Sequence, residues 1–271
     1  MIPFFLDSQT GPLFAIYWPP QTKDSVRAVL YVPAFAEEMN KSRRMVALQA
    51  RSLAEKGYLV LVIDLFGTGD SAGDFGEATW SLWLTNISDA VAWLKQQGAD
   101  VVSLWGLRLG ALLAMDFVSQ HPGVVENLLI WQPILNADSF VTQFLRLRVA
   151  AAMMNNALPQ EKTSVLKKQL QQGEAVEVAG YLLNPDLMNP LIALKIDPDA
   201  LRTLNKVAIL EIVMGSDTQS SFVNQQFLES LLTAGVDAGL TKVIGDSFWT
   251  SQEIVTAPAL LQATTESLKQ W

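Results

Sequence analysis

The alternation of apolar runs and turn residues along the chain predicts strands that are interleaved with helices. Ile2–Leu6 and Leu13–Trp18 are short apolar runs on either side of the turn cluster Asp7–Pro12, which predicts a β-hairpin. Six later apolar runs predict buried strands at Ala28–Val32, Tyr58–Ile63, Val101–Trp105, Asn127–Trp131, Val207–Val213 and Leu240–Ile244. Helical spacing and helix-ending residues predict helices at Met45–Lys56, Trp80–Gln97, Leu107–Gln120, Phe222–Ala234 and Ala257–Gln270.

This order of elements predicts an α/β fold with one interruption. Continuous apolar strands that alternate with helices are typical of a mostly parallel sheet with helices on both faces. Residues 138–196 contain helical stretches and no convincing strand. We therefore expect a core made of residues 1–137 and 197–271, with 138–196 inserted as a helical cap. The apolar residues of this insertion suit a lid over a greasy tunnel or a dimer surface, and they include Phe140, Phe144, Leu145, Leu147, Met153 and Met154.

Composition and charge narrow the function classes. The chain has 271 residues, half of them hydrophobic and 17% charged, so it can bury a large core. It has no cysteine and one histidine, which excludes disulfides, thiolate metal sites and a cysteine nucleophile. We expect no metal and no organic cofactor. The net charge of −8 argues against a nucleic-acid partner, and no apolar run reaches the ~20 residues of a membrane span. The N-terminus lacks a signal-peptide pattern, so we expect a cytoplasmic protein.

One turn between a predicted strand and a predicted helix carries the most specific signal. Ligands of open α/β sheets bind at the C-terminal ends of the strands. The segment Trp105–Ala111 (WGLRLGA) places Gly106 and Gly110 around a central Arg108. This is the spacing of the nucleophile elbow, in which a strained turn exposes one side chain beside a helix N-terminus. The residue at the centre is an arginine, where a serine would be expected.

Several such segments together resemble an α/β-hydrolase with a helical cap. More narrowly, the chain is similar to the exosortase A system-associated hydrolases of the second type. The segments that carry the resemblance are Pro33–Arg44 (PAFAEEMNKSRR), Asp64–Ser71, Trp105–Ala111, Trp131–Pro133 and Phe248–Trp249. The resemblance implies a hydrolase by superfamily membership and a link to exopolysaccharide synthesis and to sorting of proteins with a PEP-type C-terminal signal.

The usual hydrolase triad cannot be assembled from these residues. Arg108 stays protonated and has no lone pair with which to attack a substrate. Asp217 follows a strand where the triad acid belongs, but Gly245–Trp249, where the catalytic histidine belongs, contains none. The single histidine, His121, lies at the end of a predicted helix and is interpreted as a helix cap.

Two roles for Arg108 follow from its position. A cation at a helix N-terminus is unfavourable unless a counter-charge is near. Arg108 can pair with an internal carboxylate, either Glu38 or Asp217, and so plug the site. It can instead bind an anionic ligand together with the helix N–H groups. The residues predicted by position to line this ligand site are Phe35, Glu37, Asn40, Arg43, Leu109, Trp131 and Trp249.

Three hypotheses about function remain open from the sequence. The first is a degenerate hydrolase that binds a small anionic or acyl ligand. The second is an active hydrolase or acyltransferase in which Glu37, Glu38 or Asp217 acts as base to water and Arg108 stabilises an oxyanion. The third is a non-catalytic scaffold. Beyond a small molecule, we expect the partner to be a second copy of the chain or a protein of the exopolysaccharide machinery.

Overall fold

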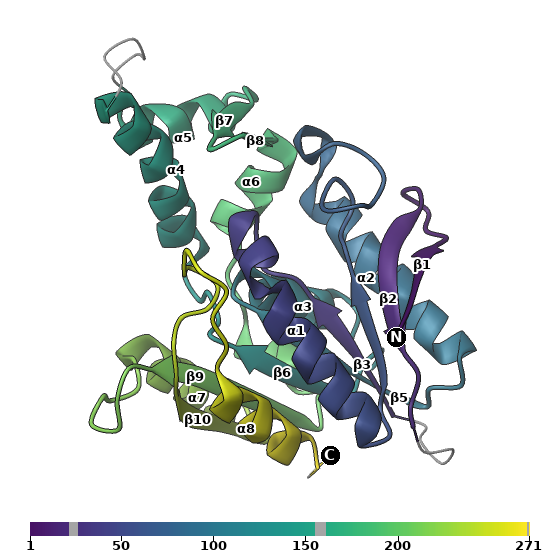
Figure 1. Cartoon of the computed structure of the whole chain (residues 1–271). Coiled ribbons are helices and arrows are strands. Elements are labelled where there is room, and N and C mark those ends of the chain that lie inside the picture. The colour runs from purple at the N-terminus through teal and green to yellow at the C-terminus, as the bar shows by residue number, and fades with distance from the viewer. Residues whose placement is uncertain (22–26, 155–160, 270) are drawn as a thin grey trace.

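An eight-stranded sheet forms the centre of the computed structural model, which describes residues 1–21, 27–154, 161–269 and 271 (Figure 1). The strand order is β1-β2-β4-β3-β5-β6-β9-β10. β1 pairs with β2 and β2 with β4 in antiparallel fashion, and all the other neighbours are parallel. The strands are β1 (Ile2–Leu6), β2 (Leu13–Trp18), β3 (Arg27–Val32), β4 (Leu59–Ile63), β5 (Val101–Leu107), β6 (Asn127–Trp131), β9 (Lys206–Val213) and β10 (Ala238–Ile244).

Helices cover both faces of this sheet, because its central strands are apolar on both sides. The helices α1 (Glu37–Glu55) and α8 (Pro258–Leu268) pack on one face. The helices α2 (Trp80–Gln96), α3 (Leu109–Gln120) and α7 (Phe222–Thr233) pack on the other. The predicted hairpin and the six predicted strands are confirmed to within a few residues. Gln270, the predicted end of the last helix, lies outside the described residues.

Helix α1 begins eight residues earlier than predicted, at Glu37 instead of Met45. The segment before Met45 is rich in Glu, Lys and Arg, so its apolar spacing gives only a weak helical signal. These polar residues form the outer face of the first two turns, while Met39, Ser42 and Met45 are buried at a spacing of three. The earlier start places Glu37 and Glu38 in a helical first turn at the edge of the sheet.

The inserted segment lies above the C-terminal ends of the strands (Figure 1). It contains α4 (Ala137–Met154), α5 (Thr163–Gln171) and α6 (Pro185–Ala193), and is followed by the 3-10 turn η2 (Pro198–Leu201). The prediction that it has no strand is wrong, because β7 (Val176–Val178) and β8 (Tyr181–Leu183) form a small hairpin. Ala179 and Gly180 both have positive φ, as a tight two-residue hairpin turn requires. Residues 155–160 of the predicted cap lie outside the described residues, which contain no helix long and apolar enough to cross a membrane.

The elbow between β5 and α3 depends on two close backbone approaches. Strand β5 continues to Leu107 and α3 begins at Leu109, so the helix starts two residues later than predicted. A Cβ atom at Gly106 would meet the backbone of Ala111, and one at Gly110 would meet the carbonyl oxygens of Val32 and Pro33. Only glycine lets α3 lie this close to β5 and to the end of β3.

We expect Gly110→Ala to destabilise the fold. Alanine favours a helix over glycine by about 1 kcal/mol, but here its Cβ would press on rigid backbone oxygens. A net loss of roughly 1–3 kcal/mol is expected from overpacking, measurable by urea denaturation. Gly239→Ala in β10 is the matched control, because a Cβ there meets nothing within 4 Å. Equal stabilities of the two variants would contradict the close approach.

Candidate functional site

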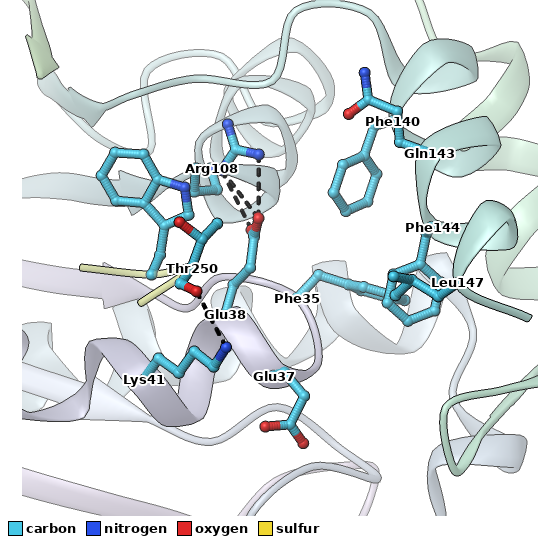
Figure 2. A pocket seen from close by; sticks show the side chains of 11 residues that line it. Phe35, Glu37, Glu38, Lys41, Arg108, Phe140, Gln143, Phe144, Leu147 and Thr250 are labelled. Carbon is cyan, nitrogen blue, oxygen red and sulfur yellow. Dashed lines mark hydrogen bonds and ion pairs between the residues drawn. The ribbon is translucent and has the colours of Figure 1, made fainter. Parts of the chain in front are cut away.

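A cavity of about 320 Å³ opens above the elbow, between the core and the inserted segment (Figure 2). It lies between the first turns of α1, the elbow, the apolar face of α4 and the loop that follows β10. The cavity is lined by Phe35, Glu37, Glu38, Lys41, Arg108, Phe140, Gln143, Phe144, Leu147, Trp249 and Thr250. Its volume is at the lower end of the range for small-molecule sites.

The floor of the cavity is an ion pair between Arg108 and Glu38. Arg108 Nε donates to Glu38 Oε1 at 3.2 Å and to Oε2 at 3.3 Å, and Arg108 Nη2 donates to Oε1 at 3.1 Å. The side chains are only 19% and 18% exposed. The Trp249 ring lies 5.5 Å from the guanidinium carbon and adds a cation–π contact. Of the two predicted carboxylate partners, Glu38 is therefore the one that pairs with Arg108.

The pKa of the Glu38 carboxyl differs from that of an exposed glutamate. Burial raises the pKa of the Glu38 carboxyl above its ordinary value, and the cations Arg108 and Lys41 oppose this rise without cancelling it. The carboxylate form of Glu38 is thus less favoured here than in water, although it is paired. A carboxyl in this state can accept or release a proton closer to neutral pH than an exposed glutamate.

The backbone of the elbow is strained at Arg108. Its φ is 56° and its ψ is −116°, which non-glycine residues rarely adopt. Such strain costs on the order of 1–3 kcal/mol and persists where the surroundings enforce it. Arg108 N donates to the carbonyl of Trp131, and the Arg108 carbonyl accepts from Ala111 and Ile134. These bonds fix the turn, and the strained turn aims the guanidinium into the cavity (Figure 2).

An aromatic cluster forms the opposite, apolar side of the cavity. Phe35 makes edge-on contacts with Phe140 and Phe144 of α4, with ring centroids 5.7 and 5.0 Å apart. It also packs edge-on against Phe75 and Trp83 of the core. Phe35 thereby joins the inserted segment to the core and gives the cavity a wall suited to an alkyl or aromatic group.

Two polar contacts close the rim of the cavity. The Tyr181 hydroxyl of β8 donates to Glu37 Oε1 at 2.8 Å, which ties the inserted segment to α1. Burial, together with the neighbouring Glu37 carboxylate, raises the pKa of Tyr181 to about 12. Lys41 Nζ donates to the carbonyl of Thr250 at 3.3 Å and ties α1 to the loop after β10 (Figure 2).

The structure brings together only part of the predicted site. Phe35, Glu37, Glu38, Arg108 and Trp249 line the cavity. Lys41, Gln143 and Thr250 also line it and were not predicted. Lys41 and Gln143 each lie three residues after a lining residue, Glu38 and Phe140, so helical spacing was the available signal.

Five predicted site residues do not line the cavity. Leu109 and Trp131 are buried in the core, where Trp131 Nε1 donates to Thr264. Arg43 pairs with Asp64 at 3.0 Å on the far side of α1's first turns. Asn40 and Asp217 are exposed, and within the described ranges the Asp217 side chain accepts a hydrogen bond from its neighbour Ser216 alone. A position at the end of a strand does not suffice to predict a cavity-lining residue, because neighbouring side chains at these ends point into the core or to solvent.

The single histidine lies at the far end of α3 from the elbow. His121 is the C-cap of this helix, its Nδ1 lies 3.1 Å from the Phe117 carbonyl, and its ring stacks on Phe117. A helix of this length, 12 residues, spans roughly 18 Å. His121 therefore cannot reach a ligand held at Arg108. The described residues contain no group of three His, Asp or Glu side chains that could hold a metal ion.

The fold is that of the α/β-hydrolase class, as the sequence predicts. The chain belongs to the family described as serine aminopeptidase, S33, which matches residues 24–208. The structure is similar to Est1E from Butyrivibrio proteoclasticus, solved with ferulic acid, with a TM-score of 0.73 and 15% identity over 98% of each chain. It is also similar to alpha/beta hydrolase domain-containing protein 10 from mouse, with a TM-score of 0.61, 15% identity, and coverage of 100% of this chain and 99% of that one.

A sequence relative matches a shorter stretch. The uncharacterized protein RP471 of Rickettsia prowazekii (strain Madrid E) is 28% identical over 110 residues. These residues make up 40% of this chain and 45% of that protein, so the match spans less than half of the relative.

We expect Glu38→Gln to gain stability relative to wild type as the pH rises from about 4 to about 7. Folding raises the pKa of Glu38, so its contribution to stability is present below the pKa of the unfolded chain and is lost as the pH rises through the folded value. Glutamine has no proton to lose. Urea denaturation across this range measures the difference, with Glu55→Gln, an exposed position in the last turn of α1, as control. The opposite trend would mean that Arg108 lowers the pKa of Glu38.

We expect Tyr181→Phe to loosen the inserted segment. The substitution removes one hydrogen bond to Glu37, which contributes about 0.5–1.5 kcal/mol. Hydrogen exchange of α4, α5 and α6 should become faster by up to about tenfold, while exchange in the central strands stays unchanged. Tyr17→Phe is the control, because no hydrogen bond of the Tyr17 hydroxyl is found within the described ranges. Unchanged exchange in α4 would show that the aromatic contacts alone hold the segment.

Proposed function

We propose that this protein is a hydrolase-fold protein without the Ser-His-Asp triad, which binds a small anionic or acyl ligand in the cavity above the elbow. The observation that carries the proposal is the placement of Arg108, a residue that cannot attack a substrate, at the point of a strained elbow that opens into a cavity. The elbow geometry presents a guanidinium where related mechanisms need a nucleophile.

The positions of the single histidine and of the predicted triad acid support the same proposal. His121 lies at the other end of α3, and Asp217 is exposed. A base within hydrogen-bond reach of the elbow and an acid to orient it are both needed for acyl transfer by the usual route. The ion pair with Glu38 partly plugs Arg108, yet about 320 Å³ of cavity remains open beside it. An open cavity favours ligand binding over a purely structural role as a scaffold.

The chemistry of the walls supports an amphipathic ligand. Arg108 offers a planar, charged donor for a carboxylate at one side of the cavity. Phe140, Phe144 and Leu147 offer an apolar surface on α4 at the other side. A short acyl or aromatic carboxylate therefore matches both sides. Its alkyl or aryl part would lie along α4 and its carboxylate would face the elbow.

The biological setting we propose is the exosortase and exopolysaccharide system, in the cytoplasm. It is supported by the resemblance of the Pro33–Arg44 and Trp105–Ala111 segments to hydrolases of that system. These two segments contribute Phe35, Glu38 and Arg108 to the cavity. The resemblance thus covers the site itself as well as the scaffold.

An active hydrolase or acyltransferase is the second candidate, and the state of Glu38 favours it. Burial raises the pKa of this carboxyl, as is common for general bases at active sites. Glu38 would activate water, and Arg108 would stabilise the oxyanion that forms. The bond between the two side chains would have to open first, because both Glu38 oxygens accept from Arg108.

Binding of octanoate to wild type and to Arg108→Ala, measured by calorimetry, tests the proposal. Removing hydrogen bonds to a charged group costs about 1.5–3 kcal/mol, so a roughly 10- to 100-fold loss of affinity is expected. Arg44→Ala is the matched control, an exposed arginine of α1 outside the cavity. Equal affinity of wild type and Arg108→Ala would contradict the proposal.

Turnover separates the two candidates. We expect no hydrolysis of p-nitrophenyl octanoate or of an octanoyl thioester by wild type above the level of Arg108→Ala. Turnover that is lost in both Arg108→Ala and Glu38→Gln would favour the active enzyme instead.

A further inference from the structure

We propose that the cavity takes up a carboxylate ligand together with one proton, which Glu38 accepts as the ligand binds beside Arg108. This inference rests on the proposed ligand-binding function and adds how that site is regulated. The protein would bind its anionic ligand more tightly at mildly acidic than at alkaline pH, without any histidine at the site.

One cation, Arg108, lies at the floor of the cavity. Arg108 uses Nε and Nη2 to hold both oxygens of Glu38. A ligand carboxylate can displace Glu38 from this edge or bind the remaining donors of the guanidinium. In either arrangement two carboxylates lie beside one guanidinium. Two carboxylates that share a site cannot both stay ionised without a large penalty, and one of them takes a proton.

The charges that line the cavity balance one another. Its charged lining residues are Glu37, Glu38, Lys41 and Arg108, which sum to zero when all are ionised. The sides contributed by α4 and by the loop after β10 add only neutral side chains, Gln143 and Thr250 among them. A bound carboxylate leaves one uncompensated negative charge next to aromatic walls, where charge is costly. Uptake of one proton restores neutrality.

Glu38 is the group that takes the proton. Of the two acidic lining residues, Glu37 is exposed at the rim and accepts from Tyr181, while the Glu38 side chain is 18% exposed and faces Arg108. The pKa of Glu38 is already raised by burial. Among the described residues, Tyr31 of β3 also interacts with Glu38, and burial keeps its hydroxyl protonated.

A protonated Glu38 also gains a partner in the complex. Its carboxyl O–H can donate to the ligand carboxylate, which forms a short, charge-assisted hydrogen bond. Arg108 then binds the ligand's charge, and Glu38 changes from competitor to donor. The proton therefore removes a repulsion and adds a contact.

The affinity of octanoate as a function of pH tests this inference. Between the pKa values of Glu38 in the free and the bound protein, the Kd should rise by up to about tenfold per pH unit, and calorimetry in two buffers of different ionisation enthalpy should show uptake of about one proton. Octane-1-sulfonate, which does not take up a proton in this range, should show the same uptake. The measurements run from about pH 5.5 to about pH 8.5.

Variants assign the proton to Glu38. Glu38→Gln should bind both probes with a flat pH profile and no proton uptake, and at alkaline pH it should bind them more tightly than wild type. Glu55→Gln should keep the wild-type profile. Circular dichroism checks folding, and Glu38→Ala replaces Glu38→Gln if the latter does not fold.

The outcomes separate the two proposals. Binding by wild type that is independent of pH and without proton uptake would overturn the coupling and leave the ligand-binding function standing. A pH dependence that persists in Glu38→Gln would also overturn it. Binding by neither wild type nor Glu38→Gln at any pH would overturn both proposals. Binding by Glu38→Gln alone would also overturn the coupling, because Glu38 of the wild type would then keep its charge and exclude the anion at every pH tested.

Discussion

The ion pair between Arg108 and Glu38 is the contact on which the site depends. Arg108 is fixed at the start of α3, where the helix dipole disfavours a cation by a few tenths to about 1 kcal/mol. At this strained elbow its guanidinium faces Glu38 (Figure 2). Glu38 supplies the compensating charge because α1 begins one residue before it. The start of α1 and the composition of the elbow are therefore linked, although 70 residues separate the two side chains in sequence.

The rest of the architecture sets the surroundings of this pair. Gly106 and Gly110 allow α3 to lie against β5 and the end of β3, which brings the elbow next to the first turn of α1. Phe35 precedes that turn and connects it to α4 by packing edge-on against Phe140 and Phe144. The inserted segment is thus held by aromatic packing and by the bond from Tyr181 to Glu37, and its α4 face closes the cavity.

The sequence predicts the frame of this protein better than its site. The central strands are continuous apolar runs, which are typical of parallel strands that are buried on both faces. Their positions and the α/β class of the fold were therefore predictable from the sequence. The start of α1 was hidden because its exposed face is strongly charged, and the hairpin β7–β8 because each strand has only three residues. Asp217 and Trp131 show that a place at a strand end does not fix a side chain's direction, which tertiary packing decides.

An ion pair whose only role is to block the cavity does not explain the features of this site. Replacing a partly buried ion pair by apolar side chains of similar volume is often neutral or stabilising, so sealing an unused cavity would favour apolar residues. This chain instead retains a strained elbow, an ion pair that is largely removed from water and an unfilled cavity of about 320 Å³. The backbone strain and the removal of the pair from water both oppose stability. Their coincidence at one point is understandable if the cost is recovered when an anion binds at Arg108.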